Sequence, residues 1–386
     1  MVFFFLLLGV LLFLSVEKIR HERRLKRIPI RIHVNGTRGK SNVTRLIAAA
    51  LRRSGIRTLA KTTGTIPCLI LPDGSEETIR RRSPANILEQ IRTIKVADRL
   101  GAQAVVIECM ALDPLLQFVS ERAMIRSTAG VITNVRPDHF EVMGDSLDDI
   151  SEALSGTIPQ NGVLITGERR YHPFFAAVAS RRGSQTVLAG EADGEAAGSA
   201  GERFLFPENI AIARTVVSSL GLDPAAVSSC LDEVPVLQES AGVVRACLED
   251  RQVHFVDAFS ANDVDSTRII QEKAFARFSC PRPRIALFNN RADRPLRMKT
   301  FVFSLLGELE YDYVAVTGEC RNLVRRFLRR RAPEKRVIFL EDGTAEEMMK
   351  SLFENIPGKE CTIVGMGNEK GPGRRLADFF REAAAQ

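Results

Sequence analysis

The chain contains few of the side chains from which disulfides and zinc sites are built. Its 386 residues include seven cysteines, an odd number, with no CxxC pair, and five histidines, none near a pair of cysteines. These absences argue against a disulfide framework and a zinc site, and they favour reduced thiols facing the cytosol. The hydrophobic content is 45% and the charged fraction 26%. That balance excludes general disorder, and the length suffices for two or three domains.

Charged side chains are missing altogether from residues 1–16, which read MVFFFLLLGVLLFLSV. As a helix this segment would extend about 24 Å, slightly less than a hydrocarbon core of about 30 Å, and local thinning of the bilayer can cover the difference. The main alternative is a cleaved signal peptide. It would have a basic segment before the apolar run and an A-x-A-like cleavage site, and neither is present. We therefore predict a transmembrane anchor over residues 1–16.

The net charge of +7 is concentrated in two places. Residues 17–31 hold seven basic residues against two acidic ones, a local charge of +5. Positive charge directly after the anchor predicts a basic juxtamembrane segment, residues 17–30, with the rest of the chain in the cytoplasm. Residues 321–336 hold eight basic residues against Glu334 and are either a solvated helix face or a guide for a polyanionic chain. Neither cluster is interleaved with aromatic residues, so no nucleic-acid partner is expected.

From Pro29 onward, short β-rich runs alternate with helical patterns, which predicts an α/β fold with parallel sheets and crossover helices. The first expected helix covers residues 41–54. The expected strands of the first series are residues 30–34, 104–108, 130–135 and 163–166.

A second series begins near Val253 and is long enough for an open α/β unit of its own. Its expected strands are residues 253–259, 284–288, 313–317, 336–340 and 362–364. We place the domain boundary near Ser240. This gives a central domain of residues 31–239 and a C-terminal domain of residues 240–386.

The most informative local pattern is NGTRGKS, residues 35–41. It follows an expected strand and opens an expected helix, which is the context of a phosphate-binding loop. Backbone N–H groups at the helix start can hold anionic oxygens, aided by the helix dipole. In such a loop Lys40 neutralises the phosphates and the Ser41 hydroxyl binds Mg²⁺. The strict GxxxxGK[ST] pattern is broken, because Val34 occupies its first glycine position, and the alternative is an ordinary strand–helix turn.

Three further polar groups follow expected strands. Glu108 ends an apolar strand, where open α/β sheets place their ligands, and its carboxylate either binds the same Mg²⁺ as Ser41 or is solvated. His139 closes the segment NVRPDH, although a single histidine is more often a packed residue than a metal ligand. Asn262, in the segment FSAND, could contact a nucleotide or cap the next helix.

Together these motifs resemble the Mur ligase superfamily. Its members share a GTxGK[ST] loop, a strand-end glutamate, an N-V-x-x-D-H segment and an Asn-rich segment that opens a Rossmann-like C-terminal domain. Here those features are Gly36–Ser41, Glu108, Asn134–His139 and Asp257–Asp263, in the same order, and the resemblance covers residues 31–386. It implies an α/β fold in which a P-loop central domain precedes a Rossmann-like C-terminal domain.

Within the superfamily the sequence is most similar to the ligase subunits of poly-γ-glutamate synthases, which serve capsule biosynthesis. An anchor stands in place of a UDP-sugar-binding domain, and the similar segments are NGTRGKSNVT at 35–44, KTTGT at 61–65, ECMA at 108–111, AND at 261–263 and NRADR at 290–294. The resemblance implies ATP-driven amide ligation. The γ-carboxylate of a glutamyl chain attacks the γ-phosphate to form an acyl phosphate. The amine of another glutamate then displaces phosphate and leaves an isopeptide bond.

The same resemblance implies roles for individual residues. The catalytic residues would be Lys40, Glu108, His139 and Arg291, the last facing the γ-phosphate. The Mg²⁺ ligands would be Ser41, Glu108 and His139. The ATP would be held by Gly36, Thr37, Arg38, Gly39, Lys40, Ser41, Asn262 and Asp263. The substrate would border Thr62, Thr63 and Thr65.

The sequence departs from the superfamily pattern by lacking one lysine. Many Mur ligases have a carbamylated lysine after the D-H pair, but residues 141–165 contain no lysine. Support for a second metal would have to come from other side chains, for which the candidates are Asp148, Asp149 and Glu152.

The resemblance also implies partners and a location. The partners are glutamate and the growing poly-γ-glutamate chain, a multi-spanning C-type subunit and an A-type subunit, all at the bacterial inner membrane. One alternative is a ligase similar to folylpolyglutamate synthase, which the anchor disfavours because a soluble substrate gives no reason for membrane attachment. The other is a nucleotide-binding subunit of a membrane exporter that hydrolyses ATP without ligation.

Overall fold

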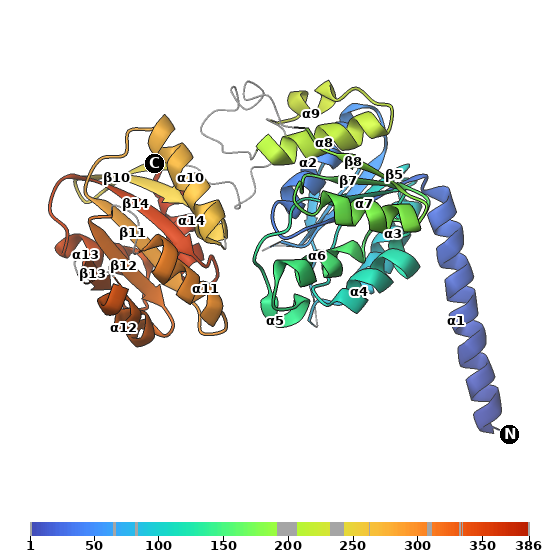
Figure 1. The fold of residues 1–386 in the computed structure, drawn as a ribbon, viewed down its shortest axis with the longest axis horizontal. Coiled ribbons are helices and arrows are strands. Elements are labelled where there is room, and N and C mark those ends of the chain that lie inside the picture. Colours follow the sequence, from blue (N-terminus) through green and yellow to red (C-terminus); the bar gives the residue numbers. More distant parts are fainter. Residues whose placement is uncertain are drawn as a thin grey trace. The chain divides into compact units, whose positions relative to one another are not determined.

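The computed structural model describes residues 2–64, 67–81, 84–190, 207–231, 243–261, 263–306, 311–331, 333 and 335–384. These residues form two compact units, unit 1 up to residue 231 and unit 2 from residue 243 (Figure 1). The predicted domain boundary near Ser240 lies outside the described residues, as do Thr65 and Asn262.

Unit 1 begins with one helix, α1 (Val2–Arg27), which contains the predicted anchor and most of the predicted juxtamembrane segment. Its apolar part is exposed, projects from the unit (Figure 1) and has a mean hydropathy of 2.4, so the helix is long and apolar enough to span a membrane. Its basic end packs on the unit. Leu25 is buried, and the His21 Nε2 atom lies 2.8 Å from the Met124 carbonyl oxygen. Part of the segment expected at the lipid surface therefore contacts protein.

The sheet of unit 1 has eight strands in the order β4-β3-β2-β5-β1-β6-β7-β8. All neighbours from β2 to β8 in this order pair in parallel, and β3 and β4 add an antiparallel hairpin at one edge. The strands are β1 (Ile30–Asn35), β2 (Thr58–Thr62), β3 (Cys68–Ile70), β4 (Glu76–Thr78), β5 (Ala104–Glu108), β6 (Ala129–Ile132), β7 (Val163–Thr166) and β8 (Gln185–Leu188). The expected strand over residues 130–135 ends early, at Ile132, so the residues that follow are free to form a loop.

Helices cover both faces of this sheet, which is why its central strands are almost wholly apolar. Val106 of β5 packs in the core that includes α2, whereas Val105 and Ile107 pack in the core that includes α3. The α-helices after α1 are α2 (Lys40–Arg53), α3 (Glu89–Arg99), α4 (Pro114–Val119), α5 (Phe140–Met143), α6 (Leu147–Ser155), α7 (His172–Arg181), α8 (Pro207–Ser219) and α9 (Ala225–Ser229). A π-helical turn, Ser120–Ile125, follows α4.

The order of the strands creates a switch point at the centre of unit 1. Strand β1 lies between β5 and β6, and all three run in parallel. Their carboxyl ends therefore meet at one edge of the sheet, which is where open α/β sheets bind ligands. This edge brings together the loop at residues 36–39, Glu108 and the segment at residues 133–139.

Unit 2 has a six-stranded sheet in the order β13-β12-β11-β14-β10-β9, parallel except for β9. All five predicted strands are present, and β9 is an additional edge strand. The strands are β9 (Val243–Leu248), β10 (Arg251–Asp257), β11 (Arg284–Asn290), β12 (Tyr313–Gly318), β13 (Arg336–Phe339) and β14 (Glu360–Gly367). The α-helices are α10 (Val264–Arg277), α11 (Pro295–Thr300), α12 (Arg321–Arg331), α13 (Ala345–Glu354) and α14 (Pro372–Ala384). Two short helical turns, Phe259–Ala261 and Phe301–Leu305, complete the unit.

Candidate active site

The loop after β1 has a conformation that two glycines make possible. Gly36 has a φ of +126° and Gly39 a φ of +81°, values that residues with side chains disfavour. A Cβ atom on Gly36 would lie 2.0 Å from the Thr133 Oγ1 atom, so the loop packs directly against the segment after β6. Val34 is fully buried within β1. Because the chain turns only at Gly36, the missing glycine at position 34 does not impair the loop.

Asn134 holds the loop in place. Its Oδ1 atom accepts hydrogen bonds from the Thr37 hydroxyl at 2.7 Å and from the Arg38 backbone N–H at 3.0 Å. Its Nδ2 atom donates to the Arg38 carbonyl oxygen at 3.2 Å. The sequence pattern marks Asn134 only as the start of the segment that ends at His139. The structure makes it a positioning residue for the loop, a role that no local pattern indicates, because its partners lie almost a hundred residues earlier in the chain.

The loop leads into the N-terminus of α2, which has the electrostatics of an anion site. No side chain caps the helix at Gly39, and its first turn has no acidic residue. Half-buried Lys40 folds over the loop, where its Nζ atom donates to the carbonyl oxygens of Gly36 at 2.7 Å and Thr37 at 3.3 Å. Uncapped N–H groups, the helix dipole and an ammonium group together favour phosphate oxygens.

Ser41 and Glu108 meet directly, as the sequence predicted. The Ser41 hydroxyl donates to the Glu108 Oε2 atom at 2.8 Å, and the Thr63 backbone N–H donates to the same atom at 2.7 Å. Both side chains are 3% exposed. Within the described part of the chain, no basic side chain forms an ion pair with Glu108. A buried carboxylate that has only neutral donors is suited to a cation, and hard oxygen donors are what Mg²⁺ prefers.

The third predicted metal ligand, His139, is placed on the same edge but with other partners. It has a φ of +46° and starts α5. Its Nδ1 atom lies 3.3 Å from a Glu141 oxygen and its Nε2 atom 3.8 Å from an Asp138 oxygen, while Asp138 also pairs with Arg38 at 3.1 Å. Among the described residues, no group of three His, Cys, Asp or Glu side chains is arranged to hold a metal ion. The role of His139 stays a prediction.

Two of the three side chains considered for a second metal have structural roles. Asp149 accepts from the Ser146 backbone N–H at 2.9 Å and completes the capping box of α6. Asp148 accepts a hydrogen bond from the Tyr171 hydroxyl at 2.6 Å. Glu152 is exposed on the same helix.

Lys61 is a buried residue near the site that sequence reasoning did not single out. Its side chain is fully buried, and the Nζ atom lies 3.1 Å from a Glu89 carboxylate oxygen and 3.2 Å from the Gln90 Oε1 atom. Burial lowers the pKa of Lys61, and Glu89 offsets part of that effect. Gln90 also reaches the Glu108 carbonyl oxygen at 3.4 Å, so this cluster ties the end of β2 to the end of β5. Of the predicted substrate loop, Thr62 is buried and Thr63 half-buried.

Two of the predicted residues of unit 2, Arg291 and Asp263, lie at the carboxyl edge of its own sheet. Arg291 follows β11 and forms a two-point contact with Asp293, at 2.9 and 2.6 Å. Asp263 caps α10, because its Oδ1 atom accepts from the Ser266 backbone N–H at 2.8 Å. Asp263 therefore fills the N-capping role on α10 that the sequence allows for Asn262.

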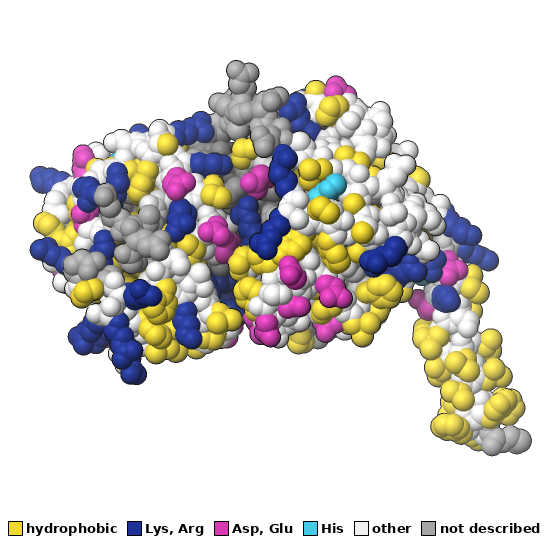
Figure 2. All heavy atoms as spheres, in the orientation of Figure 1, with side chains coloured by type: hydrophobic (Ala, Val, Ile, Leu, Met, Phe, Trp, Pro, Cys, Tyr) yellow, Lys and Arg dark blue, Asp and Glu magenta, His cyan; other side chains and the backbone are white. Residues whose placement is uncertain are grey.

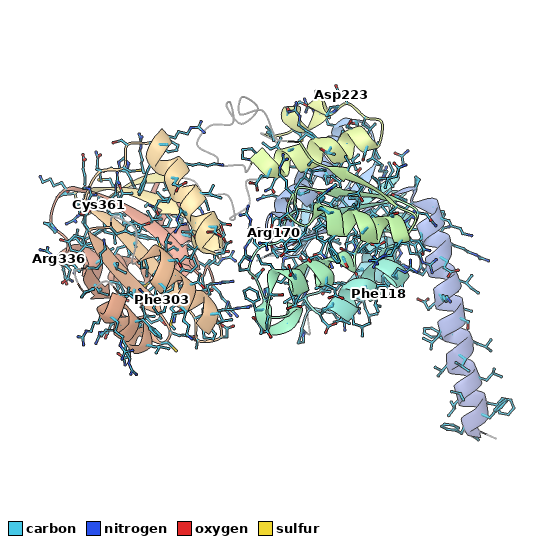
Figure 3. The ribbon with its side chains drawn as sticks, viewed as in Figure 1. Phe118, Arg170, Asp223, Phe303, Arg336 and Cys361 are labelled. Carbon is cyan, nitrogen blue, oxygen red and sulfur yellow. The ribbon has the colours of Figure 1, made fainter. Side chains whose placement is uncertain are left out.

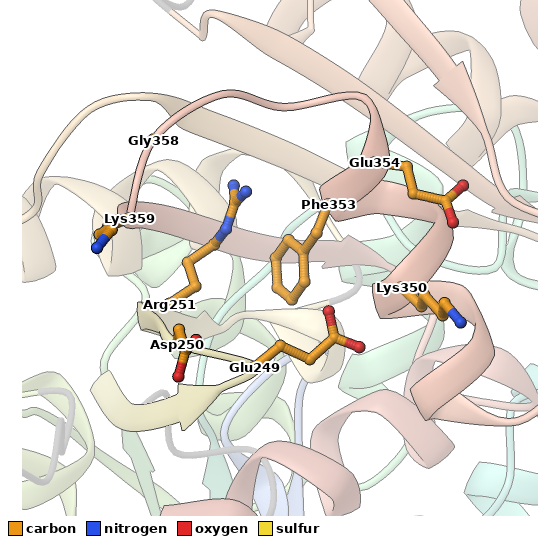
Figure 4. Close-up of a pocket in the computed structure, with 8 residues that line it drawn as sticks. All are labelled: Glu249, Asp250, Arg251, Lys350, Phe353, Glu354, Gly358 and Lys359. Carbon is orange, nitrogen blue, oxygen red and sulfur yellow. The ribbon is translucent and has the colours of Figure 1, made fainter.

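A hollow of about 350 Å³ in unit 2 is not part of this site (Figure 4). It is lined by the turn between β9 and β10, the end of α13 and the residues before β14, with Arg251 and Phe353 facing one another inside it. The hollow lies at the edge where the parallel strands β10 and β14 begin, whereas Arg291 and Asp263 follow the carboxyl ends of β11 and β10.

A buried ion pair lies behind the strand that carries the loop. The His33 Nδ1 atom is 2.9 Å from the Glu121 Oε2 atom, and both side chains are buried. Burial alone would lower the pKa of His33, but hydrogen bonds to Cys109 and Glu121 outweigh it and raise the pKa to about 9.

We expect this pair to make stability depend on pH. Because the pKa of His33 is raised above its unfolded value of about 6.5, its stabilising effect is complete below about pH 6.5 and is lost as the pH rises through about 9. Thermal unfolding followed by circular dichroism should show the wild type losing its advantage over the His33→Gln variant between about pH 6 and pH 10. A difference between the two proteins that does not change with pH would contradict this assignment.

Comparison with known proteins agrees with this arrangement. Residues 34–213 match the Mur ligase middle domain, and residues 244–383 match the poly-gamma-glutamate synthase CapB C-terminal domain. The capsule biosynthesis protein CapB of Bacillus anthracis is 32% identical over 372 residues, which cover 94% of this chain and 78% of that protein. The PGA synthase CapB of Bacillus subtilis is 32% identical over 381 residues, which cover 98% and 95%. The chain belongs to the CapB family.

A solved structure supports the fold of this CapB-family chain. The bifunctional folylpolyglutamate synthase/dihydrofolate synthase of Yersinia pestis, solved with AMPPNP and a manganese ion, aligns with a TM-score of 0.61. The alignment covers 95% of this chain and 92% of that one, at 14% identity. The predicted superfamily, the two-unit α/β fold and the class of enzyme, an amide ligase of the Mur type, are thereby confirmed.

Proposed function

We propose that this protein is an ATP-dependent amide ligase that joins glutamate units through their γ-carboxyl groups, making poly-γ-glutamate. The observation that carries the proposal is the junction of Lys40, Ser41 and Glu108 at the switch point of unit 1, in a chain of the CapB family. A loop that favours phosphate beside a carboxylate that favours a cation is what a nucleotide-dependent ligase needs.

ATP with Mg²⁺ is the proposed cofactor pair. It is supported by the analogue and the manganese ion bound to the Yersinia pestis enzyme, and by the oxygen donors of Ser41 and Glu108. The metal would supply charge neutralisation at the phosphates, and His139 is the proposed third ligand. The backbone of residues 36–39 would hold the triphosphate, and Asn262 and Asp263 of unit 2 would contact the nucleotide.

The chemistry proceeds in two steps. A γ-carboxylate oxygen of the glutamyl acceptor bonds to the γ-phosphorus of ATP while the bond to the bridging oxygen breaks, which releases ADP and leaves an acyl phosphate. The amine of the next glutamate attacks the acyl carbon. The single bond between that carbon and the phosphate oxygen breaks, phosphate leaves with the bonding electrons, and the nitrogen gives up a proton to the departing phosphate, which completes the isopeptide bond. Lys40 would turn from its loop carbonyls to the phosphates, where its charge is most useful as the phosphoryl group transfers.

Unit 2 would complete the site by bringing Arg291 to the γ-phosphate. For this, its guanidinium must exchange Asp293 for phosphate oxygens, which match the same two-point geometry. Closure would also keep water from the acyl phosphate. Solution scattering should show compaction when an ATP analogue and glutamate are added together.

The proposed location is the bacterial inner membrane, with α1 as a single-pass anchor and both units in the cytoplasm. The exposed apolar length of α1 and the basic residues that follow it support this placement. The proposed partners are the growing chain, a multi-spanning C-type subunit and an A-type subunit. A ligase similar to folylpolyglutamate synthase is the second candidate, favoured by the shared fold but not by the anchor.

The test is phosphate release by detergent-solubilised protein, co-expressed with a C-type subunit, in the presence and absence of glutamate. We expect glutamate to stimulate release and mass spectrometry to detect γ-linked oligomers. Turnover that requires a folate instead would support the second candidate. ATP hydrolysis that is indifferent to glutamate would contradict both ligases and favour the exporter alternative.

A further inference from the structure

The outer face of α12 carries positive charge that the described protein does not neutralise. Arg325, Arg326, Arg329 and Arg330, which we term the α12 basic face, are all exposed. Val324 and Leu328 on the other side of the helix are buried. None of the four arginines forms an ion pair with an acidic side chain in the described part of the chain. Figure 2 shows the corresponding group of dark-blue side chains over α12.

Several other arginines of unit 2 form ion pairs, unlike those of the α12 basic face. Carboxylates pair with Arg282, Arg291, Arg375 and Arg381. On α12, by contrast, arginines four residues apart face one another along the helix, an arrangement that destabilises a helix unless an anion lies between them. The helix dipole favours cations in the last turn, but this does not account for Arg325 and Arg326. The face is therefore arranged to receive anions from outside the unit.

Two aromatic rings orient guanidinium groups at the edges of the α12 basic face. The Arg325 guanidinium lies 4.2 Å from the centre of the Phe339 ring, and that of Arg331 lies 4.8 Å from the centre of the Phe303 ring. Figure 3 marks Phe303 beside α12. Stacking fixes the plane of a guanidinium while its N–H groups stay free to donate. Planar, oriented arginines are suited to carboxylates, which they bind in a two-point manner.

We propose that the α12 basic face binds the γ-linked polyglutamate product and holds the growing chain, an inference that rests on the proposed function. Each unit of such a chain carries one free carboxylate. Five backbone bonds separate successive units, against three in an ordinary peptide, so the extended repeat is about 6 Å. Arginines four residues apart on a helix are separated by about 6 Å along its axis. The spacing of charges along the helix axis and along the extended polymer is therefore similar.

The direction of α12 suits this role. The helix follows β12 and so begins at the carboxyl edge of the sheet, the edge at which Arg291 follows the neighbouring strand β11. It then runs back toward the amino edge, as crossover helices do. A chain bound along it would be led away from the edge that holds the predicted site residues of unit 2.

The test compares two triple variants with the same loss of charge. One is Arg326→Gln/Arg329→Gln/Arg330→Gln on the α12 basic face. The control is Arg92→Gln/Lys95→Gln/Arg99→Gln on α3, where the three side chains are also exposed and without ion pairs in the described structure. A fluorescently labelled γ-linked polyglutamate is titrated with full-length, detergent-solubilised protein without ATP, over a range of salt concentrations.

We expect the α12 variant to bind the polymer about tenfold more weakly at low salt and with less dependence on salt, and the α3 variant to bind as the wild type does. In the ligase assay the α12 variant should release shorter products. Equal binding by all three proteins would overturn the proposal. So would a variant that keeps polymer binding but binds glycerophosphoglycerol, the phosphatidylglycerol head group, more weakly than the wild type does, because the face would then serve lipid. If the wild type makes no γ-linked product, the proposed function fails. Polymer binding is measured without ATP, so its result tests the α12 basic face separately from ligase activity.

Discussion

Replacing Lys40 with alanine should lower glutamate-dependent ADP formation by about a thousandfold. The Lys40 Nζ atom lies over the loop at the N-terminus of α2 and donates hydrogen bonds to the Gly36 and Thr37 carbonyl oxygens. The neighbouring Arg38 cannot replace it easily, because its guanidinium is paired with Asp138. The lost charge acts mainly on the transferring phosphoryl group, so kcat should fall far more than the KM for glutamate rises. The measurement is a coupled assay of ADP release.

Two variants serve as controls for Lys40→Ala. Lys95→Ala removes an exposed lysine of α3 and should leave the rate unchanged. Lys40→Arg keeps the charge but alters its shape and reach, so it should recover only part of the rate. Circular dichroism should show the same unfolding temperature for all three proteins, within a few degrees. A fall of less than about tenfold in a folded Lys40→Ala protein would remove Lys40 from the catalytic step.

The loop and its neighbour Glu108 could be predicted from the sequence because their signals are local. Glycines at positions 36 and 39 are required by positive φ values at those positions, and a carboxylate at the end of an apolar strand lies at the ligand-binding edge by topology. Because β1 and β5 are parallel neighbours, the residues that follow β1, including Ser41, lie beside Glu108 at the end of β5. The separation of 67 residues between them is bridged by the sheet itself.

The residues that sequence reasoning missed depend on contacts that no spacing reveals. Asn134 holds the backbone of Arg38 from 96 residues away, and His33 pairs with Glu121 from 88 residues away. The sequence pattern places Lys61 only at the start of the KTTGT segment, whereas its burial against Glu89 depends on tertiary contacts. The short hairpin of β3 and β4 was also missed, because three-residue strands carry almost no alternation to detect.

Replacing Glu108 with glutamine should lower activity by about a hundredfold while leaving the protein as stable as before, or more stable. Glutamine keeps the shape of the side chain and an oxygen that can accept from Ser41 and Thr63, but it removes the charge. That buried charge has no ion-pair partner in the described structure, so in the absence of metal its removal relieves a desolvation cost. With metal and ATP, the variant should need at least about ten times more Mg²⁺ for half-maximal rate.

Glu121→Gln is the matched control, because Glu121 is equally buried but already has a cationic partner in His33. Removing its charge takes the ion-pair partner away from buried His33, so this variant should lose stability. Its Mg²⁺ requirement should stay that of the wild type. Measurements of stability and of the Mg²⁺ requirement therefore distinguish the two carboxylates. Glu121 stabilises the fold through its ion pair with His33, whereas Glu108 is expected to bind a cation from solution. If the Glu108→Gln protein is clearly less stable without metal and its Mg²⁺ requirement is unchanged, then Glu108, like Glu121, has only a structural role.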